Sequence, residues 1–234
     1  MNLRLINNNY LFICLLFFIF VSLQSGNTQN ILKTKNVPNP KYIVKPQNFP
    51  VMGKWMFNEE LKPADWLAMK YKGKLIQEPI NVIIIDSVSQ SHEEAVKRLI
   101  ENCAKAGFQI HGGHSAEYRG YIGENFYTQL PSGGGKAFSD NHFNSDNNHG
   151  RIFGPYFYIN KYYFTAAFSK EDFRNDEHKF DSFIAARDKF TSKMKDNAGY
   201  TIEGAFNLDN VYTNNKVFTT GDHDGIAIIL HLKK

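Results

Sequence analysis

Cysteine is almost missing from this 234-residue chain, which has only Cys14 and Cys103. Cys14 lies inside an N-terminal apolar run that we expect to be removed, so Cys103 has no intramolecular disulfide partner. Cys103 also falls within the helical apolar pattern of residues 96–106, which predicts a buried structural cysteine rather than a nucleophile. The stability of the fold must therefore come from packing.

A strong charge excess is also lacking. The chain has 27 Lys and Arg against 23 Asp and Glu, a formal charge of +4, and the basic residues are scattered rather than clustered. A mild, dispersed charge does not fit a nucleic-acid-binding surface. We therefore expect no nucleic-acid partner.

Several motifs of known chemistry are absent. The Gly-rich residues 131–137 fail the phosphate-loop pattern, because Leu130 and Ala137 stand where Gly and Ser or Thr are needed. The nucleophile-elbow pattern does not occur around Ser115. No pair of histidines has a known zinc-site spacing, so a metal would have to be assembled from distant segments. We predict no metal site and name no cofactor.

Residues 10–23 form an unbroken apolar run, preceded by Arg4 and followed by small polar residues. This is the pattern of a secretory signal peptide. As a helix the run is about 21 Å long, shorter than the roughly 30 Å hydrocarbon core of a membrane. We predict a signal peptide over residues 1–28, cleaved after Thr28, and export to the periplasm or the medium with no later transmembrane span. An uncleaved anchor is the alternative.

Residues 29–54 hold four of the eight prolines and few periodic apolar positions, which indicates an extended arm that tethers the domain or wraps it. Residues 55–234 are predicted to form one domain. Residues 62–69 indicate a short helix with Pro63 in its first turn. We expect the large apolar side chains of this region to pack onto the main domain; these side chains are Trp55, Phe57, Trp66 and Leu67.

The rest of the domain alternates strands and helices. Residues 82–85 are uniformly apolar and β-branched, which predicts a strand covered on both faces. Ser91 and Glu94 form a capping box that begins a helix over residues 92–106. A second helix is expected over residues 181–197, and further strands over residues 108–110, 162–168, 202–208, 216–219 and 226–232. The predicted fold class is α+β, a mixed sheet with a layer of two main helices.

Residues 139–150 are rich in Asp, Asn and His. The pattern matches a calcium loop only if its middle is skipped, and no Glu stands at the twelfth position. A solvated surface loop is the simpler interpretation, and calcium binding stays open. The histidines of the chain are expected at the surface or in turns.

Arg187 breaks the apolar stripe of the second helix, because it shares a face with Phe183, Phe190 and Met194. A guanidinium on a core-facing surface needs an anionic or carbonyl partner. The partner is either an internal carboxylate (Asp181, Asp222 or Asp224) or a bound anion held in a bidentate fork.

Several fragments together resemble the LssY C-terminal-like family. They are EPINVIII at residues 78–85, HGRIFGP at 149–155, TAAFS at 165–169, HKFD at 178–181 with RD at 187–188, and TTGDHDG at 219–225. The likeness spans residues 76–232. It implies a module that related chains append to membrane segments, including phosphatidic-acid-phosphatase-like domains, and that has no established reaction.

The polar positions of these fragments are His149, Arg151, His178, Asp181, Arg187, Asp188 and Asp224. His149 and Arg151 alternate on an expected strand and so share a face. Convergence of these groups would suit an anionic ligand. We therefore predict catalytic roles for His149, His178 and Asp181, and ligand-binding roles for Arg151, Arg187 and Asp224. The expected function is an exported binding or accessory module for an anionic or glycan ligand; the alternative is a hydrolase acting on a phosphorylated or acidic substrate.

Overall fold

The computed structural model describes residues 31–32, 37–115, 117–174 and 177–233. The expected signal peptide lies outside the described residues. Among the helices of the described residues, none combines the length and the apolar character needed to cross a membrane.

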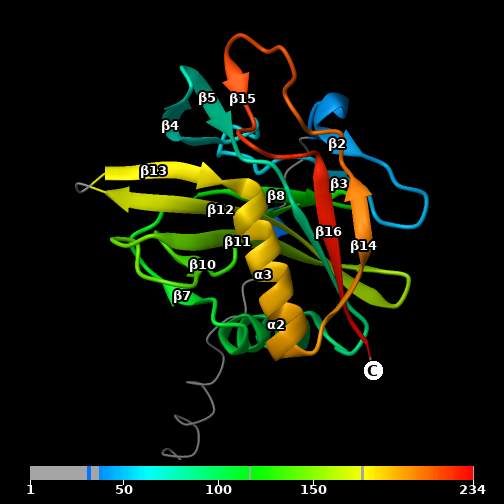
Figure 1. The fold of residues 1–234 in the computed structure, drawn as a ribbon. Helices are drawn as coiled ribbons and strands as arrows, with labels where there is room; N and C mark the ends of the chain where they lie inside the picture. The colour runs from blue at the N-terminus through cyan, green and yellow to red at the C-terminus, as the bar shows by residue number, and fades with distance from the viewer. Residues whose placement is uncertain (1–30, 33–36, 116, 175–176, 234) are drawn as a thin grey trace, which may run out of the picture.

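An eight-stranded mixed sheet forms the centre of the molecule (Figure 1). Its strands run in the order β14-β16-β6-β12-β11-β10-β7, and β13 pairs with the far end of β12. Their bounds are β6 Val82–Asp86, β7 Gln109–His111, β10 Ala137–Ser139, β11 Asn147–Tyr158, β12 Lys161–Arg174, β13 Glu177–Ser182, β14 Thr201–Asn207 and β16 Ile226–Leu232. All five residues of β6 are buried, which confirms the prediction of a strand covered on both faces.

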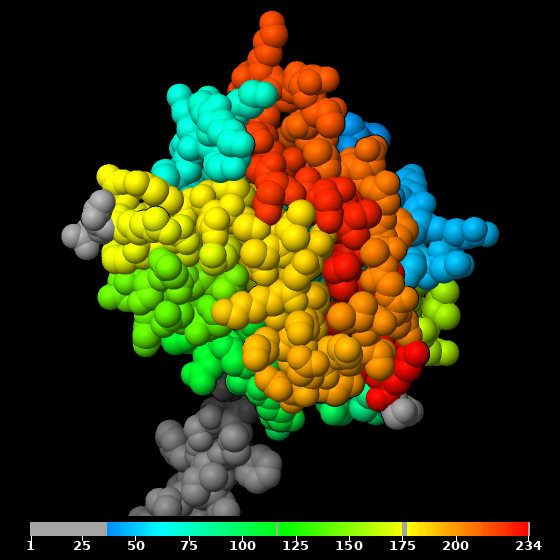
Figure 2. All heavy atoms as spheres, in the orientation of Figure 1, coloured from blue at the N-terminus to red at the C-terminus, as the bar shows by residue number. Residues whose placement is uncertain are grey.

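Two helices cover one face of this sheet, α2 (His92–Lys105) and α3 (Phe183–Ala198) (Figure 1). Ser91 caps α2 by accepting a hydrogen bond from the Glu94 amide, and α3 ends at Gly199 with φ 76°. Cys103 belongs to α2 and is buried, as predicted. In the space-filling view, the yellow-to-orange atoms of α3 lie beside the red atoms of β16 on this face (Figure 2). The predicted α+β class with a layer of two helices is confirmed.

A five-stranded sheet packs against the opposite face, in the order β1-β9-β8-β3-β2. Its strands are β1 Ile31–Leu32, β2 Ile43–Val44, β3 Met52–Gly53, β8 Arg119–Ile122 and β9 Asn125–Thr128, and a short 3₁₀ helix, η1, spans Pro40–Tyr42. Met52 is fully buried in the core between the two sheets. The described part of residues 29–54 therefore packs on the domain, as the wrapping alternative required.

A three-stranded sheet, β15-β5-β4, lies at one end of the main sheet. Its strands are β4 Asp65–Tyr71, β5 Lys74–Gln77 and β15 Phe218–Thr219. The prediction of a helix over residues 62–69 is wrong, because β4 pairs with β5 across a turn in which Lys72 (φ 50°) and Gly73 (φ 80°) are left-handed. Trp55, Phe57 and Trp66 are buried as expected, but Leu67 is 57% exposed.

The expectation for residues 139–150 is wrong at both ends of the segment. Ser139 ends β10, and Asn147 begins β11; both are buried. Only the residues between them form an exposed connection, where Asn141–Asn144 lie in solvent. Strand pairing buries these polar side chains because each finds a hydrogen-bond partner: the amide of Asn147 donates to the carbonyl of Ser145 (2.9 Å), and that of Asn148 donates to Asp140 (2.8 Å).

Candidate functional site

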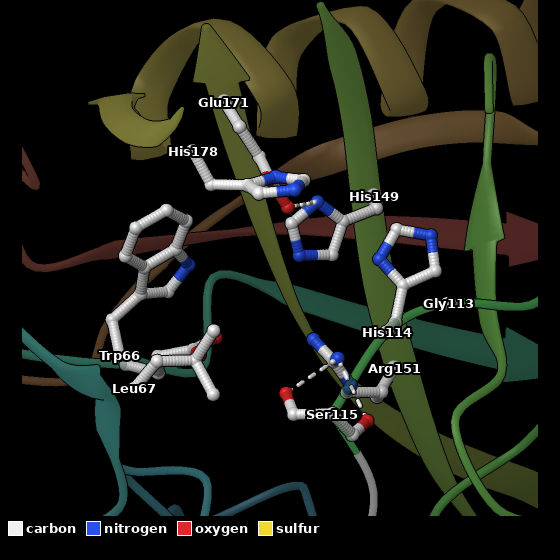
Figure 3. A pocket seen from close by; sticks show the side chains of 10 residues that line it. Trp66, Leu67, Gly113, His114, Ser115, His149, Arg151, Glu171 and His178 are labelled. Atoms are coloured by element: carbon white, nitrogen blue, oxygen red, sulfur yellow. Dashed lines mark hydrogen bonds and ion pairs between the residues drawn. The ribbon is translucent and has the colours of Figure 1, made fainter. Parts of the chain in front are cut away.

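A pocket of about 110 Å³ opens on the face of the main sheet that the helices do not cover. It lies where β11, β12 and β13 meet the three-stranded sheet and the β7–β8 connection (Figure 3). Its walls are made by Trp66, Leu67, Glu78, Gly113, His114, Ser115, His149, Arg151, Glu171 and His178. At roughly 30 Å³ per water, this volume holds three or four waters or a small anionic group.

Strand register brings the central residues together. Antiparallel pairing sets His149 of β11 opposite Ser169 of β12, and Asn147 opposite Glu171. Because side chains alternate between faces, Asn147, His149 and Arg151 share one face of β11 and meet Ser169 and Glu171 across the ladder. The expectation that His149 and Arg151 share a face is confirmed.

His178 joins the site from β13, which folds back along the end of β12 and pairs His178 with Phe173. The Nδ1 of His178 lies 2.5 Å from Oε2 of Glu171. That contact is a hydrogen bond donated by the imidazole to the carboxylate, which fixes the Nδ1–H tautomer. In the neutral imidazole, this arrangement leaves the lone pair on Nε2 of His178.

Glu171 links the two histidines. Its Oε1 lies 2.9 Å from Nδ1 of His149, while its Oε2 accepts the hydrogen bond from Nδ1 of His178. Burial by itself would raise the pKa of Glu171, but the hydrogen bonds donated by the imidazoles of His149 and His178 hold that pKa well below its usual range. Glu171 is therefore ionised at neutral pH. Burial lowers the pKa of His149, which is neutral there.

Arg151 is a buried cation with no carboxylate partner among the described residues. Only 2% of it is exposed, and one terminal nitrogen donates to the carbonyl (3.0 Å) and the hydroxyl (3.1 Å) of Ser115. The guanidinium lies 4.9 Å from the centre of the Tyr118 ring. Its Nε is buried, and no atom of the described residues accepts its hydrogen. A buried guanidinium that has one N–H without an acceptor and no carboxylate beside it is costly, so this wall of the pocket is suited to an anion.

Glu78 brings a second carboxyl group to the pocket from the chain that follows β5. It is 2% exposed, and burial raises its pKa to about 7; the charge of Arg151 opposes that rise, and the charge of Glu171 adds to it. Glu78 and Glu171 thus line one cavity with pKa values shifted in opposite directions. The carboxyl of Glu78 can hold a proton near neutral pH, whereas that of Glu171 is ionised.

His114 follows a bend at Gly113, whose φ of 89° favours glycine, and where a Cβ would stand 2.4 Å from the ring of Phe143. The ring of His114 stacks on that of His149, with centroids 4.7 Å apart. Burial, followed by the charges of His149 and Arg151, lowers the pKa of His114 to about 3. Its Nε2 is buried and has no hydrogen-bond partner within the described residues.

Asp181, Arg187 and Asp224 do not reach this pocket. Asp181 pairs with Lys170 on the rim of β12. Arg187 is buried on α3, as predicted, and its carboxylate partners are Asp224 (2.7 Å) and Asp188 (2.8 Å). Three of the six predicted site residues therefore converge (His149, Arg151 and His178), and three belong to ion pairs elsewhere.

Sequence reasoning missed Glu78, His114, Ser115 and Glu171. Glu78 is the first residue of the family-like fragment at 78–85, and His114 directly follows two glycines. Glu171 alternates with Ser169 at the end of a strand, and nothing in its neighbourhood distinguishes it from a surface residue. One nitrogen from each of His114 and His149 and one oxygen of Glu171 all lie within 4.8 Å of one another, although no metal was predicted.

A second histidine arrangement lies outside this pocket, near the C-terminal ends of β6 and β16. The Nε2 of His231 is 2.6 Å from the hydroxyl of Ser87, and its Nδ1 is 2.9 Å from Glu203. The order Ser–His–Glu is that of a serine hydrolase. However, Nδ1 of His231 makes no aligned hydrogen bond, and the same oxygen of Glu203 receives Lys233 at 2.5 Å. A carboxylate engaged in this way orients the imidazole poorly.

Comparisons of the chain with protein-family models, with characterised proteins and with solved structures find no match.

Proposed function

We propose that the pocket between β11, β12 and β13 is the active site of a hydrolase that acts on a small substrate carrying a phosphoryl or carboxylate group. The observation that carries the proposal is Arg151, a buried guanidinium that lines the pocket and whose Nε has no acceptor in the described residues. An anionic group of the substrate would supply that acceptor. A ligand-binding module, the other candidate, would use Arg151 in the same way.

Hydrolysis is favoured over binding alone by the groups around Arg151. Glu171 holds the Nδ1–H of His178, so Nε2 of His178 is available to take a proton from an attacking water. The water oxygen then bonds to the electrophilic atom of the substrate, which is phosphorus in a phosphate ester, a carbonyl carbon in a carboxylic ester or the anomeric carbon in a glucuronide, and the bond from that atom to the leaving group breaks. Glu78, protonated over part of the neutral range, lies in the same cavity and is the group that returns a proton to the leaving oxygen. In this proposal Arg151 orients the substrate and Glu171 positions His178.

The N-terminal sequence indicates the compartment in which the reaction would take place. The apolar run of residues 10–23 supports export, so we propose an extracytoplasmic substrate. The resemblance to the LssY C-terminal-like family contributes no reaction, since the module it points to has none established.

The experiment is a hydrolysis screen with p-nitrophenyl phosphate, bis(p-nitrophenyl) phosphate and p-nitrophenyl glucuronide. We expect turnover of at least one of them, and a loss of roughly 100-fold or more in kcat for His178→Ala, the usual size of a general-base contribution. The matched control is His142→Ala, because His142 is exposed and lies outside the pocket.

A thermal-shift titration with inorganic phosphate separates the two candidates. Stabilisation by phosphate that Arg151→Met abolishes, together with no turnover of any of the three substrates, would favour the binding module. Neither stabilisation nor turnover would reject both.

A further inference from the structure

We propose that His114, His149 and Glu171 bind a divalent transition-metal ion of the zinc type. The inference deepens the proposed function, because the ion would occupy the same pocket and hold the water that His178 deprotonates. Metal binding can nevertheless be measured without a substrate.

The donor set is the first argument. Two imidazole nitrogens and one carboxylate oxygen, all within 4.8 Å of one another, are the protein ligands of many catalytic zinc sites. Bonds of about 2.0–2.1 Å in tetrahedral geometry place ligand atoms roughly 3.3 Å apart, so small ring rotations would complete the site. Nitrogen donors favour zinc-type ions over calcium and magnesium, which prefer oxygen. The fourth position would face the pocket and remain open for water.

The unsatisfied nitrogen of His114 is a second, independent observation. Its Nε2 is buried without a partner in the described part of the chain, although a buried polar atom normally has one. A metal ion would satisfy this nitrogen, whereas no described protein group does.

The supporting contacts are the third argument, because metal ligands are usually held by a second layer of hydrogen bonds. Nδ1 of His149 is held by Asn147 (3.0 Å) and Glu171 (2.9 Å), so Nε2, which lies 3.4 Å from the hydroxyl of Ser169, is the nitrogen left to bind an ion. The indole of Trp66 in turn donates to the same hydroxyl (3.3 Å). The second oxygen of Glu171 is held by His178. Both of these ligands are therefore oriented before any ion arrives.

Charge connects the ion with the anionic substrate. Glu78 and Glu171 bring up to two negative charges to the pocket against the single positive charge of Arg151. When both carboxylates are ionised, their charge weakens the attraction of Arg151 for an anion. A divalent cation reverses the sign of the pocket, lowers the pKa of its bound water and so serves the proposed hydrolysis directly.

The test is isothermal titration calorimetry of the EDTA-treated protein with Zn²⁺. We expect one saturable site with a Kd in the micromolar range or tighter. His114→Ala and Glu171→Gln should each weaken the Kd by at least about 100-fold, the upper range seen when even an outer-layer partner of a metal ligand is removed. Ca²⁺ should give no saturable binding. Melting of each variant without metal checks that it folds.

The matched control is His142→Ala. His142 and His111 form a second close histidine pair outside the pocket, with ring centroids 4.6 Å apart. Removing His142 should leave the tight zinc site unchanged. Should His114→Ala fail to fold, Co²⁺ added to the wild-type protein gives a further measurement, since a four-coordinate site produces intense visible absorption that Zn²⁺ abolishes by displacement.

The inference is overturned if wild-type protein binds no Zn²⁺ and shows no such Co²⁺ spectrum. It is also overturned if a folded His114→Ala variant binds Zn²⁺ as tightly as wild type, or if His142→Ala removes the tight site. The proposed function fails separately: Arg151→Met should lose phosphate binding while keeping the zinc Kd. Zinc binding without phosphate binding or turnover would leave the metal site standing and reject the hydrolase.

Discussion

Arg187 and Asp224 form an ion pair of 2.7 Å that joins the buried face of α3 to the turn before β16. The same nitrogen of Arg187 donates to the carbonyl of Ile226 (3.0 Å), and its Nε donates to Asp188. The Arg187 side chain is 6% exposed, but Asp224 and Asp188 are 39% and 56% exposed. The cation is therefore buried while its carboxylate partners reach water.

We expect Arg187→Met to destabilise the fold by about 1–3 kcal/mol. A fully buried pair that loses one partner costs about 3–5 kcal/mol, but here the remaining carboxylates can be hydrated. The cost that remains is the loss of hydrogen bonds to charged groups and of the bond to Ile226. Urea unfolding measures the change.

The control is Lys193→Met, an exposed position on the same helix, which should stay within about 0.5 kcal/mol of wild type. A loss well above 3 kcal/mol for Arg187→Met would mean that hydration does not stabilise the carboxylates left without their partner.

Asn81 joins two neighbouring strands through its side chain. It is fully buried, accepts from the amide of Phe168 (3.0 Å) and donates to the carbonyl of the same residue (2.8 Å). Asn81→Ala leaves both backbone groups without a partner, at about 1–3 kcal/mol for each. We expect a loss of roughly 3 kcal/mol in urea unfolding. Asn144→Ala, at an exposed site, is the control; a similar loss there would show that the effect is not specific.

The fold class was predictable because its main elements carry local signals. Residues 82–85 are uniformly apolar, and Ser91 with Glu94 marks the start of α2, so strand and helix were both recognised. The helix predicted at residues 62–69 failed because tertiary pairing of β4 with β5 outweighs a helix-like composition.

The candidate site was only half predictable, and the reason is register. His149 and Arg151 are neighbours on one strand, so alternation alone placed them together. Glu171 meets His149 only because β11 and β12 pair with Asn147 opposite Glu171, which no local pattern specifies. Glu78 follows β5 of the three-stranded sheet, and His114 lies in the connection between β7 and β8, so the pairing of β11 with β12 does not predict either of them. Arg187 was correctly expected to be buried, yet burial did not reveal which carboxylate it meets.

His223 makes a stability prediction with a defined sign. It is 4% exposed, and burial lowers its pKa from 6.5 to about 4, with Asp224 opposing and Arg187 adding to the shift. The unfolded chain therefore binds the proton first, and the contribution of His223 is lost as the pH falls from about 6.5 through about 4. Over that pH interval, the free energy of unfolding of His223→Gln should fall by roughly 3 kcal/mol less than that of wild type.

The choice of Gln rests on the contacts of His223. Asn210 donates to the carbonyls of Lys54 and Ile80, so its oxygen faces Nε2 of His223 at 2.7 Å and accepts a hydrogen bond. A Gln amide can donate in the same direction. Chemical unfolding of both proteins at several pH values between 4 and 7 is the measurement. His142→Gln, at an exposed position, should follow the wild-type curve; equal slopes for His223→Gln and wild type would show that His223 titrates normally.

The Ser87–His231 contact leads to a negative prediction. Because Glu203 is not aligned with His231 and is shared with Lys233, we expect Ser87 to be an ordinary serine. A fluorophosphonate probe should not label it, and Ser87→Ala should keep the turnover found in the substrate screen. Stoichiometric labelling that disappears in Ser87→Ala would move the active site to the ends of β6 and β16.

Glu78 makes the prediction that bears most directly on the site. Burial raises its pKa from 4.5 to about 7, so the folded protein holds a proton that the unfolded chain has already released. The stability that this proton contributes is complete below about pH 4.5 and is lost as the pH rises through about 7. Relative to Glu78→Gln, wild type should therefore lose roughly 3 kcal/mol of unfolding free energy between about pH 4.5 and pH 8.

Urea unfolding of both proteins across this range is the measurement, and Glu124→Gln, at an exposed position, is the matched control that should track wild type. The pH profile of turnover gives an independent readout: if Glu78 donates the proton to the leaving group, kcat should fall above about pH 7 in wild type. Glu78→Gln should lower kcat and remove that limb. Parallel stability curves for wild type and Glu78→Gln would mean that Glu78 is ionised in the folded protein and cannot serve as the acid.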